Sequence, residues 1–141
     1  MTAVFSVTYP IRFADCDAAG IVFYPRYFEM LNGLVEDFFA QALGRSFKTL
    51  HLDQKLSVPT ARFEIDFKAP SRLEDLLVFE LAVRRIGRAS ADFAVRVRCG
   101  DETRLEGVQT IVLADMTTMK SKSWPDDLRA GLERHLVTEG A

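Results

Sequence analysis

The sequence has few of the residues that usually bind metal ions. Its 141 residues include two cysteines and two histidines. Cys16 and Cys99 lie far from each other and from His51 and His135 along the chain. Zinc sites draw their ligands from residues at short spacings, so this pattern predicts no metal site. Cys99 is instead typical of a small buried apolar residue.

Long apolar segments and an excess of one charge are also missing. The apolar runs are far shorter than the roughly 20 residues that cross a bilayer. The first residues, MTAVFSVTYPIRF, lack the basic-then-apolar order of a signal peptide. The formal net charge is -2, which gives the chain as a whole no attraction to nucleic acid or to acidic membranes. We therefore expect a cytoplasmic protein that binds neither nucleic acid nor membrane.

The rest of the composition is that of an ordinary folded domain. Hydrophobic residues make up 48% of the chain and charged residues 27%, which is typical of a globular protein. A chain of this length can bury roughly two-thirds of its unfolded surface. We expect one domain that covers residues 1–141.

One long helix is predicted over residues 25–43, where apolar residues recur with the helical period. Pro25 suits its first turn, and Gly44 suits the position after its last one. The polar strip of this helix is narrow, so most of its surface should be covered by the rest of the protein. Gly33 costs about 1 kcal/mol in a helix relative to alanine, which predicts close backbone packing there. A second helix is predicted over residues 126–135.

Five segments show the alternation of apolar and polar residues that is typical of a strand with one buried face. They are residues 5–13, 62–68, 77–83, 92–99 and 108–115. Pro10 in the first segment indicates an edge strand or a bulge. The breaks between the last four segments are short, which favours antiparallel neighbours. The sequence therefore predicts an α+β fold with one five-stranded antiparallel sheet on one buried helix, whose open edges favour self-association.

The segment between the first strand and the long helix carries a specific motif, DCDAAGIVFYPRYF, at residues 15–28. It closely resembles the signature of the 4-hydroxybenzoyl-CoA thioesterase family, one of the hotdog-fold acyl-CoA thioesterase families. The matching residues are Asp15, Asp17, Gly20, Val22, Tyr24 and Tyr27. The resemblance implies the hotdog fold, in which a sheet wraps around a long central helix, and hydrolysis of an acyl-CoA thioester.

The resemblance also implies the roles of individual residues. Asp17 is expected to be the catalytic carboxylate, either as a nucleophile on the thioester carbonyl or as a general base for water. The Tyr24 N–H at the helix N-terminus is the candidate donor to the oxyanion, and such a donor typically contributes about 3 kcal/mol. Gly20 would provide the bend that brings Asp17 toward the helix start at Pro25.

The neighbours of Asp17 admit a simpler interpretation. Aspartates between a strand and a helix commonly cap a turn, and an isolated Asp-x-Asp would favour that explanation. The full match to the signature favours catalysis for Asp17 and a supporting role for Asp15. Cys16 has no histidine nearby in sequence to activate it, so we expect it to have a packing role.

Substrate contacts are expected outside the motif. Residues 84–104 are rich in arginine, which suits the phosphates of coenzyme A, and the family places nucleotide contacts near Arg88 and Ser90. Val58, Pro59 and Thr60 open the second strand, where the family builds part of its acyl pocket across a dimer interface. The resemblance thus implies an acyl-CoA substrate, a homodimer that often doubles to a homotetramer, and no metal or redox cofactor.

Two other functions remain open at this point. The fold could serve a non-catalytic module that binds acyl-CoA or an acyl carrier protein, but such a module would be expected to lose the motif carboxylate. Dehydratases of the same superfamily use a catalytic histidine, and their histidine motif is not found in this sequence. The motif fixes neither the acyl group, aromatic or short to medium aliphatic, nor the choice between nucleophile and base.

Overall fold

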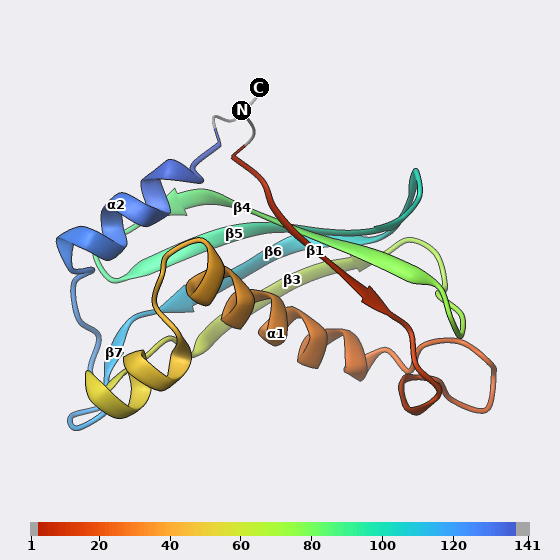
Figure 1. Ribbon diagram of the computed structural model, residues 1–141, viewed down its shortest axis with the longest axis horizontal. Helices are drawn as coiled ribbons and strands as arrows, with labels where there is room; N and C mark the ends of the chain where they lie inside the picture. Colours follow the sequence, from red (N-terminus) through yellow and green to blue (C-terminus); the bar gives the residue numbers. More distant parts are fainter. Residues whose placement is uncertain (1–2, 138–141) are drawn as a thin grey trace.

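The structure is a computed structural model that describes residues 3–137. Its centre is one antiparallel five-stranded sheet with the strand order β1-β4-β5-β6-β3 (Figure 1). The strands are β1 (Phe5–Pro10), β3 (Thr60–Phe67), β4 (Leu76–Ile86), β5 (Ser90–Cys99) and β6 (Glu102–Val112). Two short strands, β2 (Leu56–Ser57) and β7 (Ala114–Asp115), form a separate pair. The predicted α+β fold with one antiparallel sheet is confirmed.

The long helix α1 (Pro25–Gln41) packs across one face of this sheet (Figure 1). The helix face toward the sheet consists of large, buried apolar side chains. They are Leu31, Leu34, Val35, Phe38 and Phe39. The ring of Phe38 lies between Phe5 of β1 and Phe93 of β5, with both ring centroids at 5.5 Å. Each such buried side chain contributes about 1.5–3 kcal/mol, so this packing fixes the helix on the sheet.

Two glycines test the helix prediction. Gly44, just past the end of α1, has φ +65°, the left-handed conformation expected after a helix. Gly33 is partly exposed, and a Cβ placed there would meet nothing within 4 Å in the described chain. The predicted close packing at Gly33 is therefore wrong for the single chain, because this position faces away from the sheet.

The first strand is shorter than its sequence pattern suggests. β1 ends at Pro10, and Phe13 lies in the short 3-10 helix η1 (Phe13–Asp15) with its side chain 84% exposed. The chain leaves the sheet here because Pro10 has no N–H for a ladder bond. The N–H of Ile11 donates instead to the Asp75 carbonyl, at 2.8 Å.

β3 and β4 follow each other along the chain but are not neighbours in the sheet. β3 pairs with β6 at one edge, whereas β4 lies between β1 and β5. The antiparallel pairing predicted from the short connection is therefore wrong for this pair. Residues 68–75 instead cross the ends of β5 and β6. Their backbone groups bond to β6 and to the chain that leads into α1, and Ser71 is fully buried among them.

The chain ends in a second helix, α2 (Asp126–Arg134), close to the predicted bounds. The residues that follow it pair with β4, since the Val137 N–H donates to the Val83 carbonyl at 2.9 Å. The His135 ring nitrogen Nδ1 lies 2.8 Å from the Ala3 carbonyl, so the two ends of the described chain are adjacent. Within residues 3–137, no helix is both long and apolar enough to cross a membrane.

Candidate active site

The predicted catalytic carboxylate lies on the segment between β1 and α1, residues 12–24, which we call the Asp17 loop. Asp17 is exposed, and its Oδ1 accepts a hydrogen bond from the Ala19 N–H at 2.8 Å. Its backbone N–H donates to the Ile21 carbonyl at 3.0 Å. Among the described residues no group donates to Oδ2, so this oxygen is available to a ligand.

A tight turn brings the chain back toward the helix. The Gly20 N–H donates to the Asp17 carbonyl at 3.0 Å, and Gly20 has φ +81°. Residues with a Cβ are disfavoured in this conformation, so glycine is required by the turn. The predicted bend at Gly20 is thus found where the sequence places it.

The start of α1 carries a free backbone donor. Pro25 is the first helical residue and has no N–H. The Phe23 N–H donates to the Asp15 carbonyl and the Arg26 N–H to the Phe23 carbonyl, at 2.9 and 2.8 Å. The Tyr24 N–H has no acceptor within the part of the chain that the structure describes. Together with the positive end of the helix dipole, it can bind a negatively charged oxygen.

Asp15 and Cys16 hold the loop together rather than face outward. The Asp15 carboxylate accepts the Arg12 N–H at 2.9 Å, and its carbonyl accepts the Phe23 N–H. Cys16 forms an isolated antiparallel bridge with Val22 and packs partly buried against the core. These contacts agree with the supporting and packing roles expected for the two residues.

A small cavity of about 300 Å³ lies beside the helix start. Its lining comes from the end of the Asp17 loop, the first turn of α1 and the connection after β3. The lining residues are Ile21, Val22, Tyr24, Tyr27, Phe67, Lys68, Ala69, Pro70 and Ser71. The Tyr24 ring contacts Phe67, with centroids at 6.1 Å. The cavity thus lies beside the residue whose backbone N–H is free.

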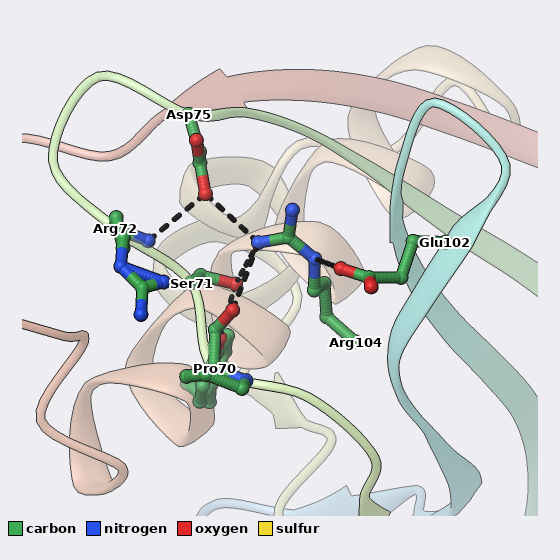
Figure 2. Close-up of polar contacts among 7 residues, drawn as sticks. Pro70, Ser71, Arg72, Asp75, Glu102 and Arg104 are labelled. Atoms are coloured by element: carbon green, nitrogen blue, oxygen red, sulfur yellow. Dashed lines mark hydrogen bonds and ion pairs between the residues drawn. The ribbon is translucent and has the colours of Figure 1, made fainter.

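A buried polar cluster behind this cavity was not predicted from the sequence (Figure 2). The Arg104 side chain is 11% exposed, and its Nη1 donates to the Pro70 carbonyl, to Ser71 Oγ and to Asp75 Oδ2, at 3.1, 3.1 and 2.8 Å. Its Nε lies 2.6 Å from Glu102 Oε1, an ion pair without the angle of a hydrogen bond. The Arg104 hydrogen bond is the main cause that holds the pKa of Asp75 below its usual range.

Tyr27 joins this cluster from the helix side. Its ring is 4% exposed, and its hydroxyl donates to Ser71 Oγ at 2.7 Å. Burial raises the pKa of Tyr27, so the hydroxyl keeps its proton at neutral pH. Its place in the motif was the one signal that pointed to Tyr27. Ser71 and Arg104 carried no local signal, because the hydrogen bonds that join them to each other, to Tyr27 and to Asp75 span more than 25 residues.

The other predicted substrate residues lie at the opposite end of the sheet from Asp17. β4 begins at Leu76 beside the Asp17 loop and ends at Ile86. The turn after it carries Arg88, and Ser90 begins β5. Arg88 donates to the hydroxyl oxygens of Ser123 and Ser121, at 2.8 and 3.0 Å. The Ser90 carbonyl accepts the indole N–H of Trp124 at 3.0 Å.

Val58, Pro59 and Thr60 lie at the same far end and line a second cavity, of about 460 Å³. The other lining residues are Asn32, Val35, Phe47, His51, Ser57 and Gln109. Gln109 is fully buried, and its Nε2 donates to Thr60 Oγ1 and Asn32 Oδ1, at 2.9 and 3.3 Å. Its Oε1 has no hydrogen-bond partner in the described chain. The lining of this cavity thus includes a fully buried glutamine whose side-chain oxygen has no hydrogen-bond partner in the described chain.

The structure therefore gathers four of the predicted site residues and separates the others from them. Asp17, Gly20, Tyr24 and Pro25 share one end of the sheet, and the remaining five lie at the other end. In residues 3–137 no three His, Cys, Asp or Glu side chains gather as a metal site requires.

The comparisons with known proteins agree with this fold and motif. Residues 11–132 match the model of the thioesterase-like superfamily, so the chain belongs to that superfamily and has its hotdog fold. The prediction of a thioesterase-type enzyme is confirmed at this level. The narrower 4-hydroxybenzoyl-CoA family stays a prediction.

Individual relatives differ in the substrates that their names give. The chain is 24% identical over 125 residues to an acyl-CoA thioesterase, YbgC, of Haemophilus influenzae, covering 87% of this chain and 91% of the relative. It is 24% identical over 132 residues to a 1,4-dihydroxy-2-naphthoyl-CoA hydrolase of Nostoc punctiforme, covering 92% and 86%. A solved 1,4-dihydroxy-2-naphthoyl-CoA thioesterase from Synechocystis has a TM-score of 0.83 at 17% identity, covering 92% of this chain and 95% of that one.

Proposed function

We propose that this protein hydrolyses acyl-CoA thioesters to a free acid and coenzyme A. The observation that carries the proposal is the exposed Asp17 carboxylate on a loop that also fixes the free Tyr24 N–H at the start of α1. Water is the only other reactant, so no electrons are transferred, and we propose that Asp17 and the Tyr24 N–H act without a metal or redox cofactor. The family assignment and the relatives' names support this chemistry.

The carboxylate can act in two ways. As a general base, Asp17 takes a proton from water while the water oxygen attacks the thioester carbonyl, and the coenzyme A thiolate leaves with its electron pair and is then protonated. As a nucleophile, Asp17 itself attacks the carbonyl, expels the thiolate and forms a mixed anhydride that water then hydrolyses. Both routes pass through a tetrahedral oxyanion. The Tyr24 N–H would stabilise that oxyanion by about 3 kcal/mol.

We propose that two copies of the chain build each complete site. β3 is an edge strand whose outer backbone groups have no strand partner in the described chain. Antiparallel pairing of two β3 strands would place the Thr60 end of one copy beside the Phe67 end of the other. Phe67 contacts Tyr24, so the cavity at Val58 in one copy would lie near the Asp17 loop of the other. A further doubling to a tetramer stays a prediction.

We propose an aromatic acyl group that carries a hydroxyl. The apolar walls at Val35, Phe47 and Val58 suit a ring, and the unpaired Gln109 Oε1 suits a hydroxyl donor. A buried acceptor without a donor costs about 1–3 kcal/mol, and a hydroxyl on the substrate would remove that cost. Arg88, on the same end of the sheet, would bind a phosphate of coenzyme A.

The test is a thiol-release assay over a panel of benzoyl-, 4-hydroxybenzoyl-, acetyl- and hexanoyl-CoA. Asp17→Asn keeps the size of the side chain and removes the charge, so turnover should fall by several orders of magnitude with the fold intact. Asp126→Asn is the matched control and should keep the turnover, because this exposed carboxylate lies in α2, away from the Asp17 loop. Near-normal thiol release from Asp17→Asn refutes the mechanism. Tight binding of acyl-CoA by the wild type with no thiol released over hours would indicate a binding module.

A further inference from the structure

One short segment of the chain holds both sides of the Asp17 loop. This segment, residues 70–75, is called the support segment here. At the loop entrance the Ile11 N–H donates to the Asp75 carbonyl at 2.8 Å. At the loop exit the Val22 N–H donates to the Ser71 carbonyl at 2.9 Å. The support segment thus sets the separation of the two sides of the loop.

Asp17 is connected to the support segment through Ile21, at the exit side of the loop. The Asp17 N–H donates to the Ile21 carbonyl at 3.0 Å, and Ile21 forms an antiparallel bridge with Arg72 of the support segment. A displacement of the support segment would therefore move the Asp17 carboxylate relative to the Tyr24 N–H at the helix start.

Two buried side chains fix the support segment from opposite sides, and they meet at one atom. Tyr27 of α1 and Arg104 of β6 both donate to Ser71 Oγ, at 2.7 and 3.1 Å. Arg104 also donates to the Pro70 carbonyl and to Asp75 Oδ2, so one guanidinium binds both ends of the support segment. All three bonds come from Nη1, at the end of the long arginine side chain, whereas Nε remains beside Glu102. A lysine side chain is one atom shorter and has no group in place of Nε, so it could not keep all of these contacts.

We propose that Tyr27 and Arg104 are positioning residues for the Asp17 carboxylate. They connect the helix that carries the oxyanion donor, through Ser71, to the segment that holds Asp17. The inference rests on the proposed thioesterase function, and it adds how the two halves of the reacting geometry are kept in register. A misplacement of about 1 Å at a reacting group can lower a rate by roughly a hundredfold, so a lost contact should appear in kcat.

The first test compares two tyrosine variants. Tyr27→Phe keeps the buried ring and removes only the hydroxyl that bonds to Ser71. Tyr9→Phe is the matched control, because the Tyr9 hydroxyl also donates to one side chain, Asp37, away from the Asp17 loop. With the acyl-CoA of the panel that is hydrolysed fastest, Tyr27→Phe should lower kcat about tenfold and change KM less than twofold. Tyr9→Phe should keep kcat, and equal kcat values for the two variants overturn the proposal.

A second variant pair tests the arginine. Arg104→Lys keeps the charge, but the side chain is one atom shorter and loses the Nε contact with Glu102, so it cannot reach the support segment from the same position. We therefore expect kcat to fall while KM is kept. The control is Arg96→Lys, since Arg96 bonds to Thr103 and Glu80 on strands of the sheet and does not contact the support segment. A kcat for Arg104→Lys equal to that of the control overturns this part of the proposal.

A double variant separates positioning from general stability. If Tyr27 acts through Asp17, adding Tyr27→Phe to Asp17→Asn should cause no further loss of the residual rate. A second tenfold loss would overturn the inference. If Asp17→Asn alone keeps near-normal thiol release, the proposed mechanism fails. If Asp17→Asn abolishes thiol release but Tyr27→Phe and Tyr9→Phe have the same kcat, only the positioning role of Tyr27 fails.

Hydrogen–deuterium exchange provides a readout that needs no substrate. In Tyr27→Phe, backbone amides of the Asp17 loop should exchange faster than in the wild type, while amides in the middle of β5 should keep their protection. Tyr9→Phe should leave the Asp17 loop unchanged. Unchanged exchange of the loop in Tyr27→Phe would contradict the proposal, whatever the substrate of the enzyme is.

Discussion

Replacing Gly107 by alanine should strongly destabilise the sheet where β3 meets β6. Gly107 pairs with Ile65 of β3. An ideal Cβ at this position would lie 1.9 Å from the Glu64 carbonyl oxygen and 2.9 Å from the Ile65 Cα. Ordinary contact of such atoms begins at 3.4 Å, so the two strands must separate locally by about 1.5 Å. Both clashing atoms belong to the backbone, so no side-chain rotation relieves the contact.

The cost can be worked from this displacement. Two hydrogen bonds of the ladder would lengthen beyond bonding distance, at about 1 kcal/mol each. Overpacking typically adds about 1–3 kcal/mol, so the free energy of unfolding should fall by about 3–5 kcal/mol. At about 2–4 °C for each kcal/mol in a domain of this size, Tm should drop by roughly 10 °C.

Urea and thermal unfolding, followed by circular dichroism, measure this effect. Gly33→Ala is the control, because a Cβ there meets nothing within 4 Å in the described chain and alanine favours a helix by about 1 kcal/mol. We expect this control to keep or raise the stability. A Tm for Gly107→Ala within 2 °C of the wild type would refute the packing of β3 on β6 described above.

Three further predictions concern pH and the loop. The Arg104 hydrogen bond lowers the pKa of Asp75 in the folded protein, so ionised Asp75 stabilises the fold above the ordinary aspartate pKa, and this stabilisation is lost as the pH falls. Between pH 7 and pH 3, the free energy of unfolding measured with urea should therefore fall less in Asp75→Asn than in the wild type. Burial and Asp37 raise the pKa of Tyr9 in the folded protein, so the stability that the protonated hydroxyl contributes is complete below pH 10 and is lost as the pH rises further. Tyr9→Phe should therefore make Tm less dependent on pH between pH 8 and 11. Gly20→Ala at φ +81° should cost about 1–2 kcal/mol and reduce thiol release.

Local patterns made much of the fold predictable. The start of α1 followed from Pro25 and the helical period, and the strands followed from their alternation. The pairing of β3 was not predictable in the same way, because strand order depends on where distant segments find hydrogen bonds. Phe13 was misplaced for a related reason, since the period continues past the proline that ends β1.

The residues of the candidate site also differ in whether a local sequence pattern could reveal them. Asp17, Gly20 and Tyr24 belong to one continuous motif, so the sequence located them together. Ser71 and Arg104 lie far apart in sequence and show no periodicity, because their buried positions are set by a connection that crosses the sheet end. Contacts made by single polar side chains across long separations leave no pattern that one sequence can reveal.

The adjacency of Ala3 and His135 makes the protein convenient to attach to other molecules. Both lie near Val83, seven strand positions from Leu76, which corresponds to about 20 Å from the end of β4 beside the Asp17 loop. A surface anchor or reporter domain fused at either terminus should leave that loop open to solution. Two copies could also be linked in tandem, which would allow a defect to be placed in one copy while the other stays intact. The spacer would have to be long, because β1 and β3 lie at opposite edges of the sheet and the proposed dimer pairs through β3.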